Sequence, residues 1–214
     1  MLDPSVIRVL SGILAVVLLT SYVLFFGFFI RKKQDPGSVK ASKPTGFILN
    51  NLWLLLASLP LIFYVLGPAV PGWVYGTPLN LSFYGEDFLQ VVSPFLVLTG
   101  ATLFLWSGRV LGQYMRVEIE IREKHELVTR GPYSRIRHPT YTGALLVEFG
   151  TILLFFHIVL VVGFLVRVAM AYKRAVLEEE LLSSEDGFGQ SYRDYMLRTG
   201  RFLPRLARHK PLSH

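Results

Sequence analysis

The side chains best suited to chemistry lie in one polar segment, residues 125–143, which separates two apolar regions. The segment reads HELVTRGPYSRIRHPTYTG and holds two histidines, three arginines and two tyrosines. Polar residues this dense at the edge of an apolar, membrane-like region are costly to keep unless they bind something. Contacts with lipid phosphates explain Arg130 and Arg135, but not the RHP triplet at 137–139. The segment is therefore a candidate small-molecule site.

The RHP triplet also predicts where the next helix begins. A residue before proline is biased away from helix, and proline suits the first helical turn. We therefore place His138 at a helix N-terminus, where free N–H groups and the helix dipole favour an anionic ligand. Tyr133 and Tyr141 add flat faces with polar tips, which suit an aromatic or cationic group.

A second cluster, Arg174 with the three glutamates at 178–180, follows the last apolar region. Arg174 and Glu178 are four residues apart, which is also typical of a plain surface ion pair on a helix. Three acids at a helix C-terminus oppose the helix dipole, and a cationic ligand would offset that cost. Two more polar residues lie within apolar sequence. Arg167 faces the bundle interior or snorkels to the membrane surface, and His157 is expected in a solvated turn.

The composition indicates that an integral membrane protein positions these residues. Of the 214 residues, 52% are hydrophobic and 17% are charged, against roughly 25% charged in soluble domains. With no cysteine, the chain has no disulfide, thiolate metal site or cysteine nucleophile, and no other metal site is predicted. The net charge of +7 comes largely from basic loops beside apolar segments, which suits anionic lipid headgroups rather than nucleic acid.

Four regions approach or exceed the roughly 20 apolar residues that a membrane-spanning helix needs. They are residues 6–30, 47–70, 88–106 and 141–171. The first is longer than a signal-peptide core and ends in the basic residues 31–33, so we expect it to be retained. The loops at 31–46 and 107–139 are basic, whereas the loop at 71–87 has no Lys or Arg. This pattern places the two basic loops in the cytoplasm.

The last apolar region is long for a single span. One crossing would put the basic C-terminal residues outside the cell, against the positive-inside tendency. We therefore predict a helical hairpin that turns near Phe156 and His157. The predicted fold class is an all-α integral membrane protein with about five transmembrane helices, its N-terminus outside and its C-terminus inside. An amphipathic segment follows on the cytoplasmic surface, around residues 192–203.

Taken in order, the motifs resemble those of the isoprenylcysteine carboxyl methyltransferase family, membrane-integral enzymes that use S-adenosylmethionine. The chain is similar to a short member of prokaryotic type, and the resemblance covers residues 105–204. The matching motifs are HxLVTxGxY from His125, RHPxYxG from Arg137, RxxxEEE from Arg174 and FGxxYxxYxxxTGRxxP from Phe188.

The resemblance implies a division of the chain and a set of site residues. Residues 1–106 would be a lipid-facing scaffold of three spans, 107–204 the cofactor-binding core with the hairpin, and 205–214 a basic tail. Glu178 would hold the amino acid moiety of S-adenosylmethionine, and Arg174, as the catalytic residue, would face the acceptor carboxylate. Either Glu118 or Glu120 is a candidate for the acceptor side. The implied cofactor-binding residues are His125, Glu126, Leu127, Val128, Tyr133, His138, Pro139, Thr140, Tyr141 and Glu178.

The activity implied is methylation of a lipophilic acceptor, foremost the carboxylate of a prenylated cysteine or an analogue. The partners implied are membrane lipids and a lipophilic or prenylated substrate, either a small molecule or a protein. Three alternatives stay open. One is a phospholipid N-methyltransferase, and another is a non-enzymatic membrane scaffold. The third is an NADPH-dependent reductase of the sterol type, because RHPxY also occurs in those enzymes.

Overall fold

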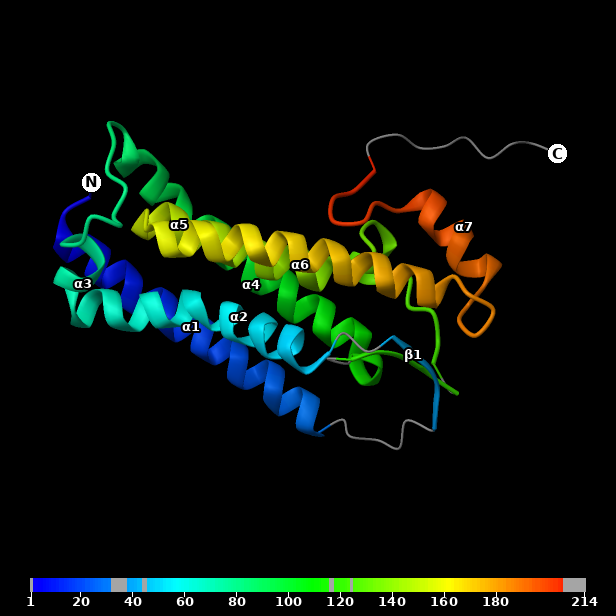
Figure 1. Ribbon diagram of the computed structural model, residues 1–214. Coiled ribbons are helices and arrows are strands. Elements are labelled where there is room, and N and C mark those ends of the chain that lie inside the picture. The colour runs from blue at the N-terminus through cyan, green and yellow to red at the C-terminus, as the bar shows by residue number, and fades with distance from the viewer. Residues whose placement is uncertain (1, 32–37, 44–45, 116–117, 124, 206–214) are drawn as a thin grey trace.

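The computed structural model describes residues 2–31, 38–43, 46–115, 118–123 and 125–205. The described chain is mostly helical, as predicted, and its long helices run roughly along one axis (Figure 1). Lys32, Lys33 and nearly all of the predicted basic tail lie outside the described residues.

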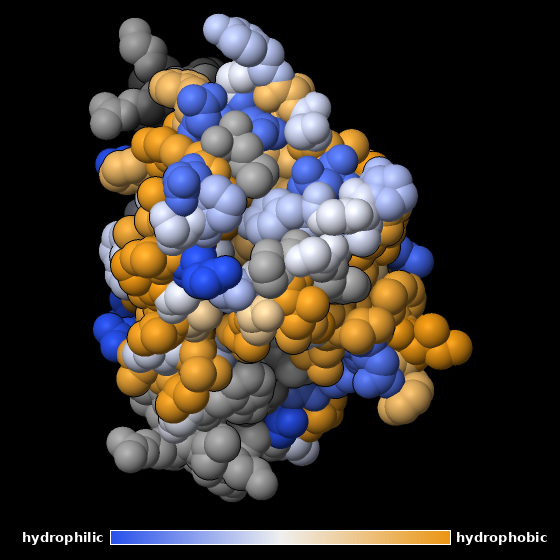
Figure 2. Space-filling model, turned by 90° about the vertical axis from the view of Figure 1, so that its left-hand side faces the viewer, coloured by the Kyte–Doolittle hydropathy of each residue, from blue (hydrophilic) through white to orange (hydrophobic). Residues whose placement is uncertain are grey.

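Three helices of the described chain are long and apolar enough to cross a membrane. Each coincides with one of the first three apolar regions predicted from the sequence. Their flanks expose many large apolar side chains, as suits contact with lipid, and apolar residues cover much of the sides of the molecule seen from one end (Figure 2). The helices are α1 (Pro4–Arg31), α2 (Phe47–Ala69) and α4 (Glu86–Leu111), with the short α3 (Pro71–Tyr75) between the last two.

The helix α5 (Pro139–Phe155) packs closely against α4 through glycines. A Cβ atom placed on Gly143 would lie 2.7 Å from the carbonyl oxygen of Gly100, and one on Gly100 would lie 2.6 Å from that of Gly143. Small residues at a helix crossing allow such close backbone approach. This contact fixes the position of α5 and of the polar segment that leads into it.

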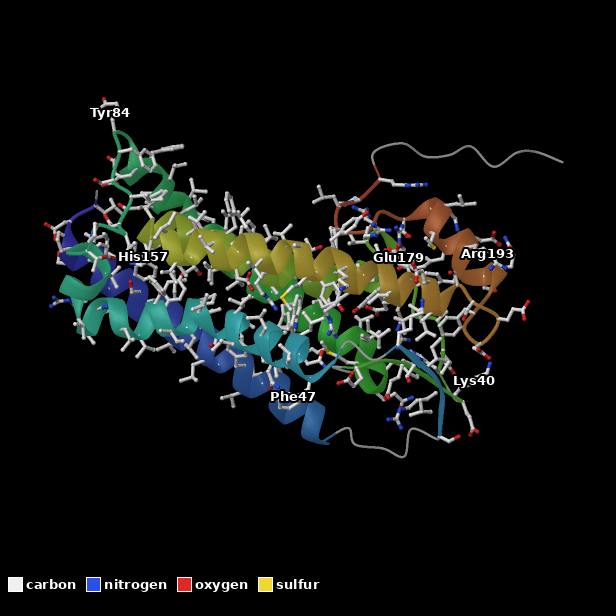
Figure 3. The ribbon with its side chains drawn as sticks, in the orientation of Figure 1. Lys40, Phe47, Tyr84, His157, Glu179 and Arg193 are labelled. Atoms are coloured by element: carbon white, nitrogen blue, oxygen red, sulfur yellow. The ribbon has the colours of Figure 1, made fainter. Side chains whose placement is uncertain are left out.

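The apolar run at 141–171 is divided between α5 and α6 (Ile158–Leu182), which run in opposite directions (Figure 1). The turn uses Phe156 with a left-handed φ of 43°, which is uncommon for a bulky residue. The loop before α4 holds the turn: Leu81 N–H donates to the Phe156 carbonyl and Ile158 N–H to the Leu79 carbonyl. The expectation of a solvated His157 is wrong, because the residue is 2% exposed and its ring packs against Phe63 of α2, with centroids 5.0 Å apart (Figure 3).

The opposite end of the bundle, here called the polar end, carries the remaining elements. A two-stranded antiparallel sheet forms there, which the all-α prediction did not include. Its Ile119 and Ile121 side chains are buried against Leu181 of α6, and this burial accounts for the ordered pairing of such short strands. The elements are β1 (Val39–Lys43), β2 (Ile119–Arg122), the 3-10 helices η1 (Gly112–Tyr114) and η2 (Gly131–Ser134), and α7 (Gln190–Arg198).

Candidate functional site

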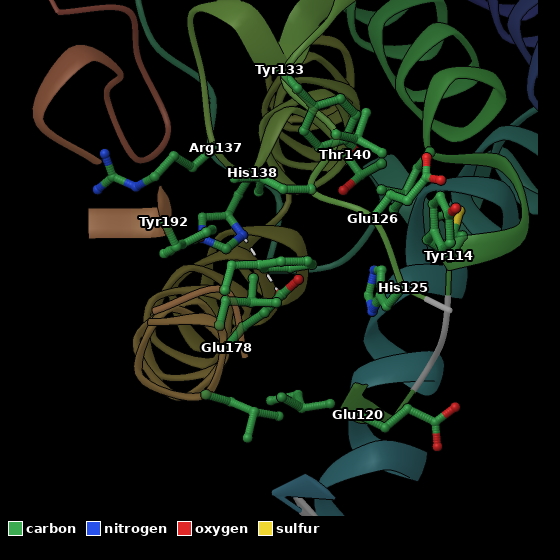
Figure 4. A pocket seen from close by; sticks show the side chains of 18 of the residues that line it. Tyr114, Glu120, His125, Glu126, Tyr133, Arg137, His138, Thr140, Glu178 and Tyr192 are labelled. Carbon is green, nitrogen blue, oxygen red and sulfur yellow. Dashed lines mark ion pairs between the residues drawn. The ribbon is translucent and has the colours of Figure 1, made fainter. Parts of the chain in front are cut away.

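A cavity of about 120 Å³ opens at the polar end, between the segment before α5 and the end of α6 (Figure 4). Of the cofactor-binding and catalytic residues that the family resemblance implies, only Pro139 does not line it; Pro139 is buried as the first residue of α5. The structure thus brings together two clusters that are far apart in the chain. The predicted residues on its wall are His125, Glu126, Leu127, Val128, Tyr133, His138, Thr140, Tyr141, Arg174 and Glu178.

His138 sits at the N-terminus of α5, as the RHP triplet predicts. Its ring stacks on Tyr141, with centroids 5.4 Å apart and planes 3° apart. Its Nδ1 lies 3.6 Å from a carboxylate oxygen of Glu178, and the Tyr141 hydroxyl donates to the same oxygen at 3.2 Å. The positive end of a helix and a carboxylate therefore face one small space, which suits a ligand carrying both an anionic and a cationic group.

The neighbouring Glu179 points away from this space and is fully engaged in ion pairs. It accepts from Arg137 Nε at 2.8 Å and from Arg201 Nη2 at 2.7 Å, and its Oε1 lies 3.1 Å from His138 Nε2. Burial alone would raise the pKa of Glu179, but the hydrogen bonds from His138, Arg201 and Arg137 hold it well below the usual carboxyl range. Glu179 is thus a charged anchor that orients His138, a role the sequence did not reveal.

The TGR motif at 199–201 forms a strap over the RHP triplet. Arg137 N–H donates to the Gly200 carbonyl at 2.8 Å and His138 N–H to the Arg201 carbonyl at 3.0 Å. A Cβ on Gly200 would meet the Leu203 carbonyl oxygen at 1.7 Å, so this position requires glycine. The strap holds the backbone just before α5 and places the Arg201 side chain in contact with Glu179.

The amphipathic segment predicted around residues 192–203 begins within α7, and this helix turns its aromatic face toward the protein. Tyr192 and Tyr195 are buried, and the Tyr195 hydroxyl donates to the Tyr133 carbonyl at 2.6 Å. Burial raises the pKa of Tyr195 to about 12, so its hydroxyl remains a donor at neutral pH. The helix therefore supports η2 and the cavity wall.

Aromatic rings form the far wall of the cavity. His125 stacks on Tyr114, with ring centroids 4.8 Å apart, and meets the edge of Phe188 at 5.6 Å. The Tyr133 hydroxyl is buried near Thr140 but makes no hydrogen bond of regular geometry to any described residue. A buried hydroxyl in that state marks a place where a ligand can supply the partner.

A second, apolar cavity of about 320 Å³ lies among α1, α2, α4, α5 and α6. Its wall is mostly aliphatic and aromatic, including Leu18, Phe25 and Phe104. It shares part of its wall with the first cavity, so a polar space and an apolar space meet inside the bundle. The shared residues are Met115, Thr140, Tyr141 and Arg174.

Arg174 is buried where the two cavities meet, and α2 holds it in place. Its Nη1 donates to Asn50 Oδ1 at 2.9 Å, and its guanidinium lies 5.4 Å from the centre of the Trp53 ring. Asn50 in turn donates to Glu118 at 2.7 Å, which connects one of the two predicted acceptor-side acids to Arg174. The other, Glu120, pairs with Arg122 on the same strand.

Asn50 and Trp53 were missed by reasoning from the sequence. The sequence did contain one signal for Asn50, the pair of asparagines near the start of an otherwise apolar span. Asparagine is costly in lipid unless its amide group forms hydrogen bonds within the helix bundle. The motifs begin more than fifty residues later, so none of them pointed to α2.

Comparison with known proteins finds the same family that the order of the motifs resembles. Residues 92–184 match the family model described as the isoprenylcysteine carboxyl methyltransferase family. A protein-S-isoprenylcysteine O-methyltransferase of Xenopus laevis is 30% identical over 142 residues, covering 64% of this chain and 49% of that protein. The Tribolium castaneum enzyme of the same name is 33% identical over 44% of this chain and 33% of its own length.

A third relative, protein-S-isoprenylcysteine O-methyltransferase B of Arabidopsis thaliana, is 31% identical over 48% of this chain and 51% of its own length. The chain thus spans about half or less of the length of these curated relatives. The region matched by the family model contains all of α5 and α6 and most of the cavity wall. Through this region, the chain is similar to the isoprenylcysteine carboxyl methyltransferase family.

Proposed function

We propose that this protein is a membrane methyltransferase that uses S-adenosylmethionine to methylate a lipophilic acceptor. The acceptor group proposed is a carboxylate, as in a prenylated cysteine or an analogue. The observation that carries the proposal is the meeting of a polar cavity and an apolar cavity at one buried arginine, Arg174. The named activity of the three relatives supports it.

The side chains of the polar cavity suit the chemical groups of S-adenosylmethionine. The start of α5 at Thr140 and Tyr141 suits its carboxylate, and Glu178 suits its ammonium group. His125 and Tyr114 offer ring faces for an adenine, and the Tyr133 hydroxyl lacks a regular partner among the described residues. When bound, S-adenosylmethionine supplies an electrophilic methyl group on a sulfonium.

The chain's own contribution is to hold the acceptor and keep water away. A carboxylate is ionised at neutral pH, so the proposed acceptor needs no general base. Arg174 can bind it at the junction, and the apolar cavity can take its hydrocarbon part away from water. An amine acceptor would have to lose a proton before it could accept a methyl group. In its ammonium form it would also meet the buried Arg174 charge, which makes a phospholipid amine the less suitable acceptor.

We further propose that α5 and α6 cross the membrane together, giving five spans with the polar end in the cytoplasm. By the rise of 1.5 Å per residue, the 17 residues of α5 extend about 26 Å, slightly less than a hydrocarbon core of roughly 30 Å. The apolar part of α6 has a similar length and ends before Lys173. The basic loops predicted to be cytoplasmic support this orientation.

The test is binding of S-adenosylmethionine to the purified protein by calorimetry, followed by methyl transfer to a prenylcysteine. Binding should be lost in Glu178→Ala and kept in Glu185→Ala, which changes an acid in the turn after α6. Binding of NADPH in place of S-adenosylmethionine would overturn the proposal in favour of a reductase. Methyl transfer to an amine lipid but to no carboxylate would overturn the acceptor assignment alone.

A further inference from the structure

One buried ion pair lies inside the apolar cavity, away from the proposed reaction centre. Glu148 of α5 and Arg167 of α6 both line that cavity, and they are 7% and 2% exposed. Arg167 Nε donates to Glu148 Oε1 at 2.8 Å. The Arg167 guanidinium carbon also lies over the Trp53 ring, 3.5 Å from its centre, and Arg167 Nη1 donates to the Trp53 carbonyl at 3.0 Å. A charge pair in an apolar cavity is expensive to keep, so it calls for a function.

The pair leaves one acceptor atom without a partner. Glu148 Oε2 is buried and has no hydrogen-bond partner within the described part of the chain. A carboxylate oxygen can only accept, and leaving such an atom unsatisfied costs the full free energy of its desolvation. The missing partner is therefore a donor that enters the cavity.

The position of Glu148 relative to the reaction centre can be read from both helices. Glu148 follows Tyr141 by seven residues on α5, and Arg167 precedes Arg174 by seven residues on α6. Seven residues are nearly two helical turns, so the two residues of each pair lie on the same face of their helix. They are separated by about 10 Å along the helix axis. Two independent helices thus place the ion pair at the same depth below the junction of the cavities.

We infer that Glu148 selects acceptors that carry a neutral hydrogen-bond donor, such as a hydroxyl or amide N–H, about 10 Å from the group that is methylated. The donor is neutral because Arg167 already balances the Glu148 charge, so an ammonium group would lose its hydration without gaining a free counter-charge. A plain hydrocarbon chain has nothing to offer Glu148 Oε2. This inference rests on the proposed function, since it assigns a further specificity to the same acceptor.

The test uses three synthetic carboxylate acceptors that differ only at one carbon, which lies about 10 Å from the carboxylate. That carbon is a methylene in the first acceptor, a secondary alcohol in the second and a ketone in the third. In the wild-type protein, kcat/KM for the alcohol should exceed that for the ketone by at least about tenfold, the lower end of the effect of a hydrogen bond to a charged group. Glu148→Gln should reverse the order. The amide oxygen of the variant side chain would keep the bond from Arg167, and its N–H₂ group would face the cavity and favour the ketone.

Thr151→Val is the matched control, because Thr151 lies one turn further along α5 and donates to the Val147 carbonyl of its own helix. It should keep the wild-type ratio. Equal kcat/KM for all three acceptors in the wild-type protein would overturn the inference and indicate that water satisfies Glu148. That result needs no variant, so a poorly folded Glu148→Gln would not leave the question open.

A binding measurement separates this inference from the proposed function. With Trp73 and Trp106 replaced by phenylalanine, Trp53 is the remaining tryptophan of the chain and reports on the cavity by its fluorescence. Tighter binding of the alcohol than of the ketone, without any methyl transfer, would uphold the role of Glu148 and overturn the methyltransferase proposal. Methyl transfer with no preference between alcohol and ketone, in rate or in binding, would uphold the methyltransferase proposal and overturn the role of Glu148.

Discussion

Two adjacent glutamates near the end of α6 have opposite surroundings. The Glu178 side chain is 34% exposed and faces the cavity, whereas that of Glu179 is 4% exposed and held by Arg137 and Arg201. Consecutive residues on a helix point about 100° apart, so one face of α6 serves a ligand and the next serves the fold. The same substitution is therefore expected to have different consequences at Glu178 and at Glu179.

Glu179→Gln should lower the stability of the protein, and Glu178→Gln should not. Removing one partner of a buried ion pair costs about 3–5 kcal/mol, and here it would leave Arg137 uncompensated. We expect a clear fall in the melting temperature of detergent-solubilised Glu179→Gln. Glu178→Gln should instead melt near the wild-type temperature and bind S-adenosylmethionine at least tenfold more weakly. A stable Glu179→Gln protein would contradict this division of roles.

The depressed pKa of Glu179 also predicts a dependence of stability on pH. Because the folded-state pKa lies below the ordinary value of 4.5, the carboxylate stabilises the folded state fully at pH values above 4.5. That contribution is lost as the pH falls from about 4.5 toward the lower folded value. The difference in melting temperature between wild type and Glu179→Gln should therefore shrink over this range. A constant difference down to pH 3 would be inconsistent with the ion pairs.

Arg174→Lys tests whether the shape of the cation matters as well as its charge. A lysine cannot keep both the bond to Asn50 and the position against Trp53, because it lacks the planar guanidinium. We expect kcat/KM for a carboxylate acceptor to fall at least tenfold, while S-adenosylmethionine binding changes little. The control is Lys173→Ala at the exposed neighbouring position, which should retain activity. Full activity of Arg174→Lys would show that a point charge suffices.

Among the elements, the α4–α5 crossing positions the polar segment. Gly143→Ala would bring a Cβ within 2.7 Å of backbone atoms of both Gly100 and Phe104. Backbone cannot move aside as a flexible side chain does, so we expect a loss of about 1–3 kcal/mol from overpacking and a lower melting temperature. Gly12→Ala on α1 is the matched control, since nothing lies within 4 Å of its Cβ position. Replacing that glycine should leave stability unchanged or raise it by up to about 1 kcal/mol.

The element boundaries show what a single sequence can reveal. Local chemistry predicted the start of α5 at the RHP triplet and the first three apolar helices, because proline geometry and apolar length act within a few residues. The bend at Phe156 carried no Gly or Pro signal, and the structure makes it with a left-handed phenylalanine braced by residues 79–81. That bracing comes from a loop more than seventy residues earlier.

The candidate site shows the same limit. The motifs supplied the residues on α5 and α6, because their spacing is local. Asn50 reaches Arg174 across 124 residues, and the strap reaches back about 60 residues to the RHP triplet. Such contacts depend on how helices pack and leave no spacing pattern in one sequence. The anchoring role of Glu179 likewise depends on partners from distant segments, namely Arg137, His138 and Arg201.

Over the whole molecule, the C-terminal strap closes the polar end onto the bundle. Ending the chain after Arg198 would remove the carbonyls of Gly200 and Arg201 that hold residues 137 and 138, together with the Arg201 side chain. We expect this truncation to abolish S-adenosylmethionine binding, measured by calorimetry. Ending the chain after Arg205 keeps every contact described for the strap and should preserve binding. Equal affinity of both truncated proteins would contradict a role for the strap in shaping the cavity.

The shared wall of the two cavities has a thermodynamic consequence. Because Met115, Thr140, Tyr141 and Arg174 line both spaces, a molecule that shifts these side chains in one cavity changes the surface presented in the other. Linkage then requires reciprocity: the factor by which the first ligand alters the affinity of the second equals the factor in the reverse direction. The two ligands would thus behave as mutual allosteric effectors across a partition of four side chains, whichever of them arrives first.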